Sequence, residues 1–137
     1  MPIIIDHNVQ ARLVTVPSLT RDIPVGLRYD RQDPFAVRIV FPSDVSLDGH
    51  EVVWVFSREL LEEGMRSPAG PGDVHVRPGE TGRTVVELRA PEGVAVIEFA
   101  TADLRRFLRG TYELVSGGDE RHELDIDRVL TALLRGV

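Results

Sequence analysis

The feature that most constrains the fold is a pair of apolar segments joined by a very short turn. RTVVELRAP and GVAVIEFA are both rich in β-branched residues, which is typical of strands, and only the turn PEG connects them. Strands joined by so few residues pair antiparallel, because a parallel connection needs a crossover of about a dozen residues or more. The chain is therefore predicted to build an antiparallel sheet rather than a doubly wound parallel fold.

Five further segments have the same character. Val9, Ala11 and Leu13 alternate with polar neighbours, which is the period of a half-buried strand. The other strand-like segments are residues 25–29, 35–41, 51–56 and 73–78. The turn-rich stretches PSLTRDIP, DRQDP and PSDVSLDGH separate the first four. Together with the first pair, this pattern predicts about seven strands.

Three segments change to a helical period. Ser57 is a predicted N-cap and Gly64 a predicted C′ residue, which bounds one short helix. Thr101 is predicted to cap a second helix over residues 102–109. Asp125 is predicted to cap the last helix. The inward stripe of the second helix is Leu104, Phe107 and Leu108, and the apolar face of the last is Ile126, Val129, Leu130, Leu133 and Leu134.

The resulting order is four strands, a helix, three strands and two helices (ββββα-βββ-αα), which is a twisted antiparallel α+β fold. No repeat, low-complexity tract or long linker interrupts it, so residues 1–137 are predicted to form one domain. Two or three short helices cannot generously cover a sheet of seven strands. We therefore expect a homo-oligomer that hides the remaining sheet surface.

Composition and charge narrow the function classes. The formal net charge is −6, and all 16 basic residues are Arg because the chain has no Lys. An acidic chain without a basic run is a poor nucleic-acid binder, since phosphate contacts supply most non-specific affinity. The absence of Cys excludes a thiolate nucleophile and a Cys-based zinc site. MPIIID is far too short for a membrane span, so the chain is expected to be soluble and cytoplasmic.

The histidines are the first candidates for chemistry. They are His7 next to Asp6, His75 within DVHVRP, and His122 beside Glu123, Asp125 and Asp127, with His50 as the fourth. A zinc site needs three or four ligands at recognisable spacing, and the chain has no HxxxH or HExxH pair. Histidines on the surface or on a strand face explain the pattern more simply. The acids near the last helix have an equally plain role, which is to oppose the helix dipole.

Other catalytic and cofactor motifs are missing. The chain has no GxSxG, SxxK, GxGxxG or P-loop sequence, so we predict no enzyme activity, no cofactor and no metal. Single-stranded nucleic-acid binding would need basic and aromatic residues on one surface. The candidates are Arg105, Arg106 and Arg109 on the second helix, Arg77, Arg83 and Arg89 on the middle strands, and the aromatic residues Phe35, Phe41, Trp54 and Phe56. These aromatic residues lie in apolar strand runs, where core packing explains them first.

An ordered set of strings carries a family resemblance. The strings are GLRYD and DPFAV, VVWVFSRELLEEG, GPGDVHVRP, APEGVAVIEF and FLRGTYELV, and they extend over about residues 9–134. In this order and spacing they resemble the SsgA-like proteins (SALPs) of actinomycetes, small regulators of sporulation-specific cell division. No single string is diagnostic alone, but the set is specific.

The resemblance implies a non-enzymatic role at the division septum. The family's central member, SsgB, recruits the tubulin-like GTPase FtsZ to future septum sites, so the implied partners are FtsZ or another SsgA-like protein. The implied fold is a homotrimer similar to the whirly-type single-strand nucleic-acid binders. Nucleic-acid binding is therefore the alternative function, by fold analogy alone. The family defines no catalytic residues, so none is assigned here.

Two charged stretches remain to be interpreted, one on the first helix and one between two predicted strands. The polar side of the first helix, with Arg58, Glu59, Glu62 and Glu63, is the predicted partner-binding surface. A solvated helix face explains the same pattern, and both interpretations stay open. The charged stretch RYDRQDP is predicted to be a turn, because the residue before a Pro avoids the helical region and Asp can bond its own backbone.

Overall fold

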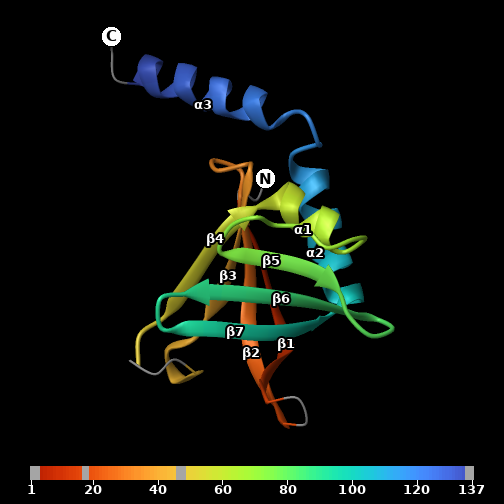
Figure 1. Cartoon of the computed structure of the whole chain (residues 1–137). Coiled ribbons are helices and arrows are strands. Elements are labelled where there is room, and N and C mark those ends of the chain that lie inside the picture. The colour runs from red at the N-terminus through yellow and green to blue at the C-terminus, as the bar shows by residue number, and fades with distance from the viewer. Residues whose placement is uncertain (1–3, 17–18, 46–48, 135–137) are drawn as a thin grey trace.

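The computed structural model describes residues 4–16, 19–45 and 49–134 and consists of one seven-stranded sheet with three α-helices (Figure 1). The strands are β1 (Ile4–Val16), β2 (Leu19–Asp30), β3 (Ala36–Phe41), β4 (Val52–Ser57), β5 (Val74–Pro78), β6 (Arg83–Ala90) and β7 (Gly93–Ala100). The helices are α1 (Arg58–Gly64), α2 (Thr101–Leu114) and α3 (Glu120–Leu134), and a 3-10 turn covers Ser43–Val45. The predicted α+β class and element order are confirmed.

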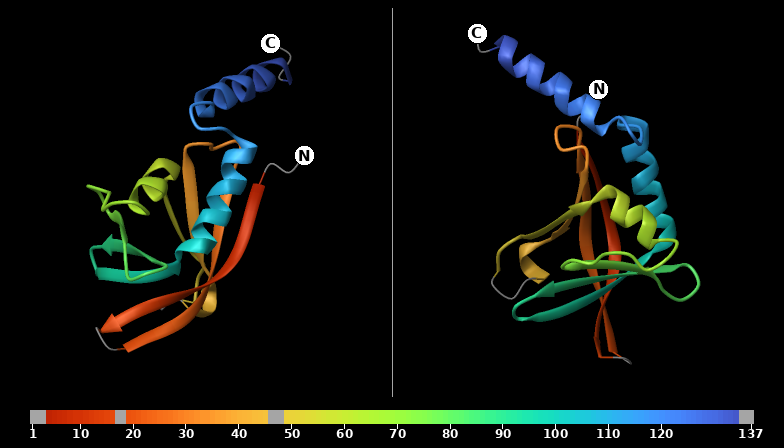
Figure 2. Two further views of the ribbon diagram at one scale, coloured as in Figure 1. Left: turned by 90° about the vertical axis from the view of Figure 1, so that its right-hand side faces the viewer. Right: turned by 45° about the horizontal axis from the view of Figure 1, so that its top comes forward.

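All neighbouring strands pair antiparallel, in the order β4-β3-β2-β1-β7-β6-β5. The first hairpin is much longer than its sequence pattern indicated, because β1 and β2 stay paired from Ile4 opposite Asp30 to Val16 opposite Leu19. The sheet curls strongly, so that β5, β6 and β7 run across the direction of β1 and β2 (Figures 1 and 2). This curl gives the sheet a concave inner face, which holds the core.

The core follows the alternation of the strands. In β2 the buried residues are Ile23, Val25, Leu27 and Tyr29, while the residues between them face outward. Two helices close one end of the concave face: α1 packs against β4 and β5, and α2 packs against β1 and β7. The predicted inward stripe of α2 is confirmed, since Leu104, Phe107 and Leu108 are all buried.

The ends of α1 show one confirmed and one corrected prediction. Ser57 is the N-cap, and its Oγ accepts a hydrogen bond from the backbone N–H of Leu60 at 2.9 Å. Gly64 is the last helical residue rather than a left-handed C′ residue, so that prediction was wrong. Its role is close packing: a Cβ at Gly64 would lie 2.2 Å from the Cβ of Val76 on β5. Glycine here lets the helix touch the strand.

The other two helices are longer than predicted. Helix α2 runs from Thr101 to Leu114, and Thr101 is its first residue rather than its cap. The N-cap is Ala100, whose methyl side chain cannot accept a hydrogen bond, and the Thr101 hydroxyl is bonded to that of Thr84 at 2.8 Å inside the core. Helix α3 begins at Glu120, five residues before the predicted cap at Asp125. Its apolar face is present but exposed, and the helix points away from the sheet (Figure 2).

The charged stretch between β2 and β3 is a turn, as predicted. The N–H of Asp33 donates to the carbonyl of Asp30 at 2.9 Å, and the Asp33 carboxylate pairs with Arg38 at 2.7 Å. Tyr29, however, is completely buried, and its hydroxyl donates to the carbonyl of Pro34 at 2.9 Å. One end of the turn is therefore fixed from inside the core.

Candidate interaction surface

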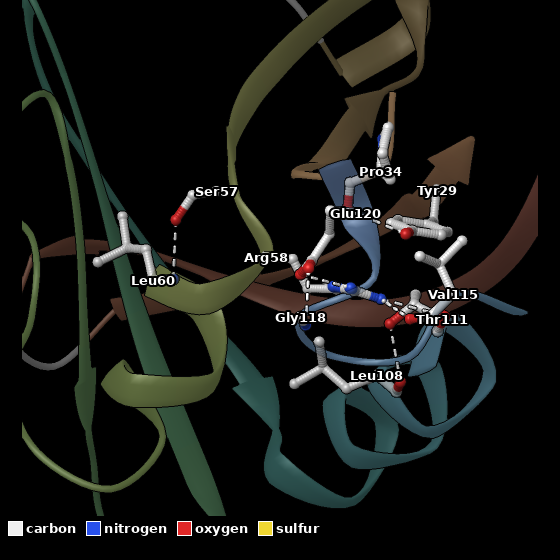
Figure 3. A network of polar contacts seen from close by, with 10 residues as sticks. All are labelled: Tyr29, Pro34, Ser57, Arg58, Leu60, Leu108, Thr111, Val115, Gly118 and Glu120. Carbon is white, nitrogen blue, oxygen red and sulfur yellow. Dashed lines mark hydrogen bonds and ion pairs between the residues drawn. The ribbon is translucent and has the colours of Figure 1, made fainter. Parts of the chain in front are cut away.

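Arg58, the first residue of the predicted partner-binding surface, is not on the surface. Only 1% of its side chain is exposed, which makes it the largest fully buried side chain among the described residues. The prediction of an exposed Arg58 was wrong because the side chain turns inward from the first position of α1. It ends between α2 and the start of α3 (Figure 3). Arg58 is thus unavailable to a partner.

The buried guanidinium group is held by three hydrogen bonds and two aromatic rings. Nη1 donates to the carbonyls of Thr111 and Val115, at 3.1 and 2.7 Å. Nη2 donates to Oε2 of Glu120 at 2.8 Å, which is also an ion pair. The Arg58 Cζ lies 5.0 Å from the centroid of the Tyr29 ring and 4.1 Å from that of the Tyr112 ring. Arg58 therefore ties the end of α2, the beginning of α3 and β2 together; we call these residues the arginine clasp.

Glu120 is the acidic partner in the clasp. Burial of its carboxyl group opposes ionisation, but the hydrogen bonds from Arg58 and from backbone N–H groups, with the Arg58 charge, outweigh it and lower its pKa. Its other oxygen accepts the N–H of Gly118 at 2.8 Å. Because Glu120 is the first residue of α3, the clasp fixes the point from which α3 leaves the domain.

Both tyrosines of the chain belong to the clasp, and both have a pKa raised to about 12. For Tyr29 the main cause is burial, which the positive charge of Arg58 partly opposes. For Tyr112 burial comes first, followed by the nearby carboxylate of Glu62. The two phenols therefore stay neutral and pack on the guanidinium as apolar rings.

The three glutamates of the predicted surface lie on or near the outer side of α1. Glu59 and Glu63 are exposed, whereas Glu62 is half-buried. Glu62 lies beside Tyr112 and forms an ion pair with Arg66 at 3.9 Å. Without Arg58, the surface that α1 offers to a partner is purely acidic. Its role in partner binding stays a prediction.

A second feature is an apolar groove on the concave face of the sheet. Its volume is about 450 Å³, and its lining comes from strands β1, β2, β3, β4, β6 and β7 and the β6–β7 turn. The floor is formed by Ile23, Phe41, Trp54, Leu88 and Ile97. Val52 and Val94 are exposed apolar residues of the lining, together with Arg21 and Glu92. Neither α1 nor α2 lines this groove, so this end of the concave face is open in the described part of the chain.

The remaining candidates do not converge. His7 is half-buried and its ring meets that of Phe107 edge-on, His75 lies on β5, and His122 is exposed on α3. Within the described residues, no group of three or more His, Cys, Asp or Glu side chains could hold a metal ion. The hydroxyl of Ser57 is used in capping. These residues form no catalytic arrangement.

The candidate arginines and aromatic residues lie on different elements of the fold. Arg105, Arg106 and Arg109 are exposed on α2, whereas Arg77 and Arg89 both bond Glu87 on the sheet. Phe41 and Phe56 are buried, and Trp54 packs against the core from the groove floor. Only Phe35 is strongly exposed among the four aromatic candidates. Three of these four aromatic side chains therefore pack in or against the core, as the sequence indicated.

No helix in the described ranges is long and apolar enough to cross a membrane.

Comparison with known proteins identifies the family of this chain. A family model described as "Streptomyces sporulation and cell division protein, SsgA" matches residues 23–120, from β2 to the first residue of α3. The chain belongs to the SsgA family. The resemblance seen in the sequence is thereby confirmed.

The similarity to relatives in the SsgA family covers nearly the whole chain. The sporulation-specific cell division protein SsgB of Salinispora tropica is 39% identical, over 98% of this chain and 96% of its own. SsgB of Streptomyces coelicolor is 38% identical, over 90% of both. A crystal structure of an SsgA-like sporulation-specific cell division protein from Thermobifida fusca has a TM-score of 0.83 at 33% identity and covers 94% of each chain. A structure reported with mutations in SsgB that correlate to longitudinal cell division in Streptomyces coelicolor has a TM-score of 0.80.

Proposed function

We propose that this protein is a non-enzymatic adaptor of sporulation-linked cell division, which positions the division machinery at septum sites by binding FtsZ. The observation that carries the proposal is membership in the SsgA family, with SsgB relatives 38–39% identical over at least 90% of each chain. These relatives are named sporulation-specific cell division proteins.

The chemistry of the surface supports binding rather than catalysis. The buried charged group, Arg58, is used to join three elements of the chain rather than to face a cavity. The groove floor is apolar, which suits packing and offers no acid, base or nucleophile. An acidic helix face and an open apolar groove are features of a protein-binding domain.

We propose the acidic side of α1 as the contact with FtsZ or another SsgA-like protein. Glu59 and Glu63 point to solvent from a helix whose inner side is fixed by Arg58 and Leu61. A rigid helix presents these charges at fixed positions, which favours a specific partner over a diffuse ionic attraction. We also propose that the protein works as a homo-oligomer, a trimer on the family resemblance. Light scattering tests this, and a monomeric mass would contradict it.

Co-sedimentation with polymerised FtsZ tests the function. The protein is expected to enter the pellet with FtsZ polymers and to stay in the supernatant without them. Glu59→Arg with Glu63→Arg is expected to reduce the pelleted fraction, whereas Asp44→Arg with Glu80→Arg, which reverses two exposed turn charges, leaves it unchanged. If the wild-type protein stays in the supernatant at saturating polymer, FtsZ binding is refuted. If both double variants behave alike, the contact lies elsewhere than on α1.

A further inference from the structure

The sheet has two edge strands, β4 and β5, and the fold covers only one of them. The outer edge of β5 is covered, because Val76 exchanges two backbone hydrogen bonds with Ala69, at 2.9 and 3.0 Å, and α1 packs against the strand. The outer edge of β4 pairs with no described residue. This strand forms the margin of the sheet and leads directly into α1 (Figure 1).

The register of β4 shows which of its backbone groups are free. The N–H of Arg58 donates to the carbonyl of Phe35 at 2.7 Å, and residues of an antiparallel ladder alternate between bonded and non-bonded pairs. By the β3–β4 register, Trp54 therefore bonds β3, whereas Val53 and Val55 direct their N–H and C=O groups away from it. These outward groups have no hydrogen-bond partner among the described residues.

β4 also lacks the features with which proteins protect a free edge. Such features are charged side chains, proline, a β-bulge or a very short strand. The strand has the sequence VVWVFS, and its register with β3 has no irregularity. Val52, Val53 and Val55 are 38, 41 and 51% exposed. A free edge with exposed β-branched side chains favours the addition of another strand.

A second groove lies along this edge and offers space for a side chain of an added strand. This edge groove has a volume of about 350 Å³ and is lined by β4, by Leu60 of α1 and by residues 70–74 before β5. A Cβ at Gly72 would meet no atom within 4 Å, so the loop leaves open space there. Side chains of a strand alternate between its two faces. The residue opposite Trp54 would therefore point toward the edge groove.

The charges around β4 are acidic. Glu51 precedes the strand, Glu59 follows it in the first turn of α1, and Asp73 lines the edge groove. All three are exposed, and none forms an ion pair with a described residue. A second β4 would bring like charges together in either direction, because both of its ends are acidic. The edge therefore favours a partner strand with basic ends.

We infer that β4 accepts an extended segment of a partner protein as an additional antiparallel strand of the sheet. The segment that fits has β-branched residues opposite Val53, Trp54 and Val55 and a basic residue opposite Glu51. The antiparallel direction matches every other pair in the sheet and lets each outward residue exchange both bonds with one partner residue. In this mode backbone hydrogen bonds give affinity and the side-chain groove gives specificity. The inference rests on β4 and does not depend on FtsZ binding.

A synthetic peptide, Arg-Thr-Val-Ile-Val-Thr-Arg, tests this inference with the full chain. Binding is followed by the fluorescence of Trp54, which is the only Trp and lines the edge groove. In one modified peptide, N-methyl groups on both valines block the N–H groups that face β4. In the matched control, N-methyl groups on both threonines block N–H groups that face away. The valine form is expected to bind about tenfold or more weakly, and the threonine form as tightly as the unmodified peptide.

Amide hydrogen exchange shows where the peptide lies. In the free protein the N–H groups of Val53 and Val55 are expected to exchange faster than that of Trp54, because only Trp54 bonds β3. At a peptide concentration of about ten times Kd, exchange at Val53 and Val55 is expected to slow about tenfold, because it proceeds from the unbound protein.

Substitutions on β4 test the same contact from the protein. Val55→Pro removes an outward N–H but keeps the ladder to β3, and it is expected to weaken peptide binding about tenfold or more. Val53→Lys is the second variant, which preserves the test if proline disturbs the fold. Its control is Val129→Lys, which adds the same charge to the exposed apolar face of α3 and is expected to leave binding unchanged.

Four results would overturn the inference. They are a peptide that does not bind, equal binding of both N-methylated forms, binding that leaves exchange at Val53 and Val55 unchanged, and equal losses from Val53→Lys and Val129→Lys. Slow exchange of Val53 and Val55 in the free protein that becomes fast on dilution also overturns it, because a second copy then covers the edge.

Discussion

Replacing Arg58 with Met is the sharpest perturbation that this structure offers. The substitution keeps an unbranched, flexible side chain in the core but removes the charge and all the donors. The carbonyls of Thr111 and Val115 and the carboxylate of Glu120 then lose their bonds to Arg58 together. Since Arg58 is 1% exposed, water does not replace it without opening the packing between α1, α2 and α3.

The magnitude follows from what the clasp contains. Hydrogen bonds to charged groups contribute about 1.5–3 kcal/mol each, and one of the three goes to a carboxylate. Against this stands the desolvation of the guanidinium, whose Nε has no hydrogen-bond partner among the described residues. Removing one partner of a buried pair costs about 3–5 kcal/mol in net terms. With an unfolding entropy of about 2.1 cal/mol/K per residue for 137 residues, the expected fall in Tm is roughly 10–17 °C.

Urea unfolding followed by the fluorescence of Trp54, the only Trp of the chain, measures this loss. The matched control is Arg66→Met in the turn after α1, where the side chain is 72% exposed and touches Glu62 only at 3.9 Å. That variant is expected to lose less than about 0.5 kcal/mol. If Arg58→Met unfolds within about 1 kcal/mol of the wild type, the clasp does not hold the domain together.

Four further results are expected. Because folding lowers the pKa of Glu120 below its ordinary value of 4.5, the ionised carboxylate stabilises the folded protein at pH values above 4.5. This stability is lost as the pH falls through the folded pKa, so Glu120→Gln is expected to weaken the dependence of the unfolding free energy on pH in acid. The raised pKa of Tyr29 and Tyr112 predicts no phenol ionisation in the folded protein at pH 10 and a midpoint near 12 by ultraviolet titration. The unfolding free energy is expected to fall as the pH rises from 10 to 12, because the unfolded tyrosines ionise first. Tyr29→Phe removes one buried hydrogen bond and is expected to lower the unfolding free energy by about 1 kcal/mol in urea. Gly64→Ala is expected to destabilise by about 1–3 kcal/mol or more through its clash with β5, whereas Gly72→Ala, with open space around it, changes the urea midpoint little.

The sheet was predictable from the sequence because its information is local. Alternation in residues 9–13 and the short turn between β6 and β7 each depend on neighbouring residues, and both predictions were confirmed. Helix ends were predicted less well. Thr101 has the side chain of a cap, but the core uses its hydroxyl to bond Thr84 instead. Tertiary packing overrode a local preference there.

The clasp could not be predicted, because its members are far apart in the sequence. Arg58 follows a helix cap and precedes three glutamates, which is also what an exposed helix face looks like. Its partners Thr111, Val115 and Glu120 lie 53 or more residues away. The structure places both tyrosines of the chain around the same guanidinium, but nothing in the sequence links Tyr29 and Tyr112 to Arg58.

A titration that sets FtsZ against single-stranded DNA tests the proposed role most directly. The full chain, labelled through Arg128→Cys, is titrated with FtsZ polymers and separately with single-stranded DNA at low and at physiological salt, and fluorescence anisotropy is followed. An adaptor predicts saturable binding to FtsZ polymers at both salt concentrations and no binding to DNA at physiological salt. Binding to DNA that is tight at low salt and falls steeply with added salt, together with no response to FtsZ, would contradict the adaptor role and favour a nucleic-acid binder.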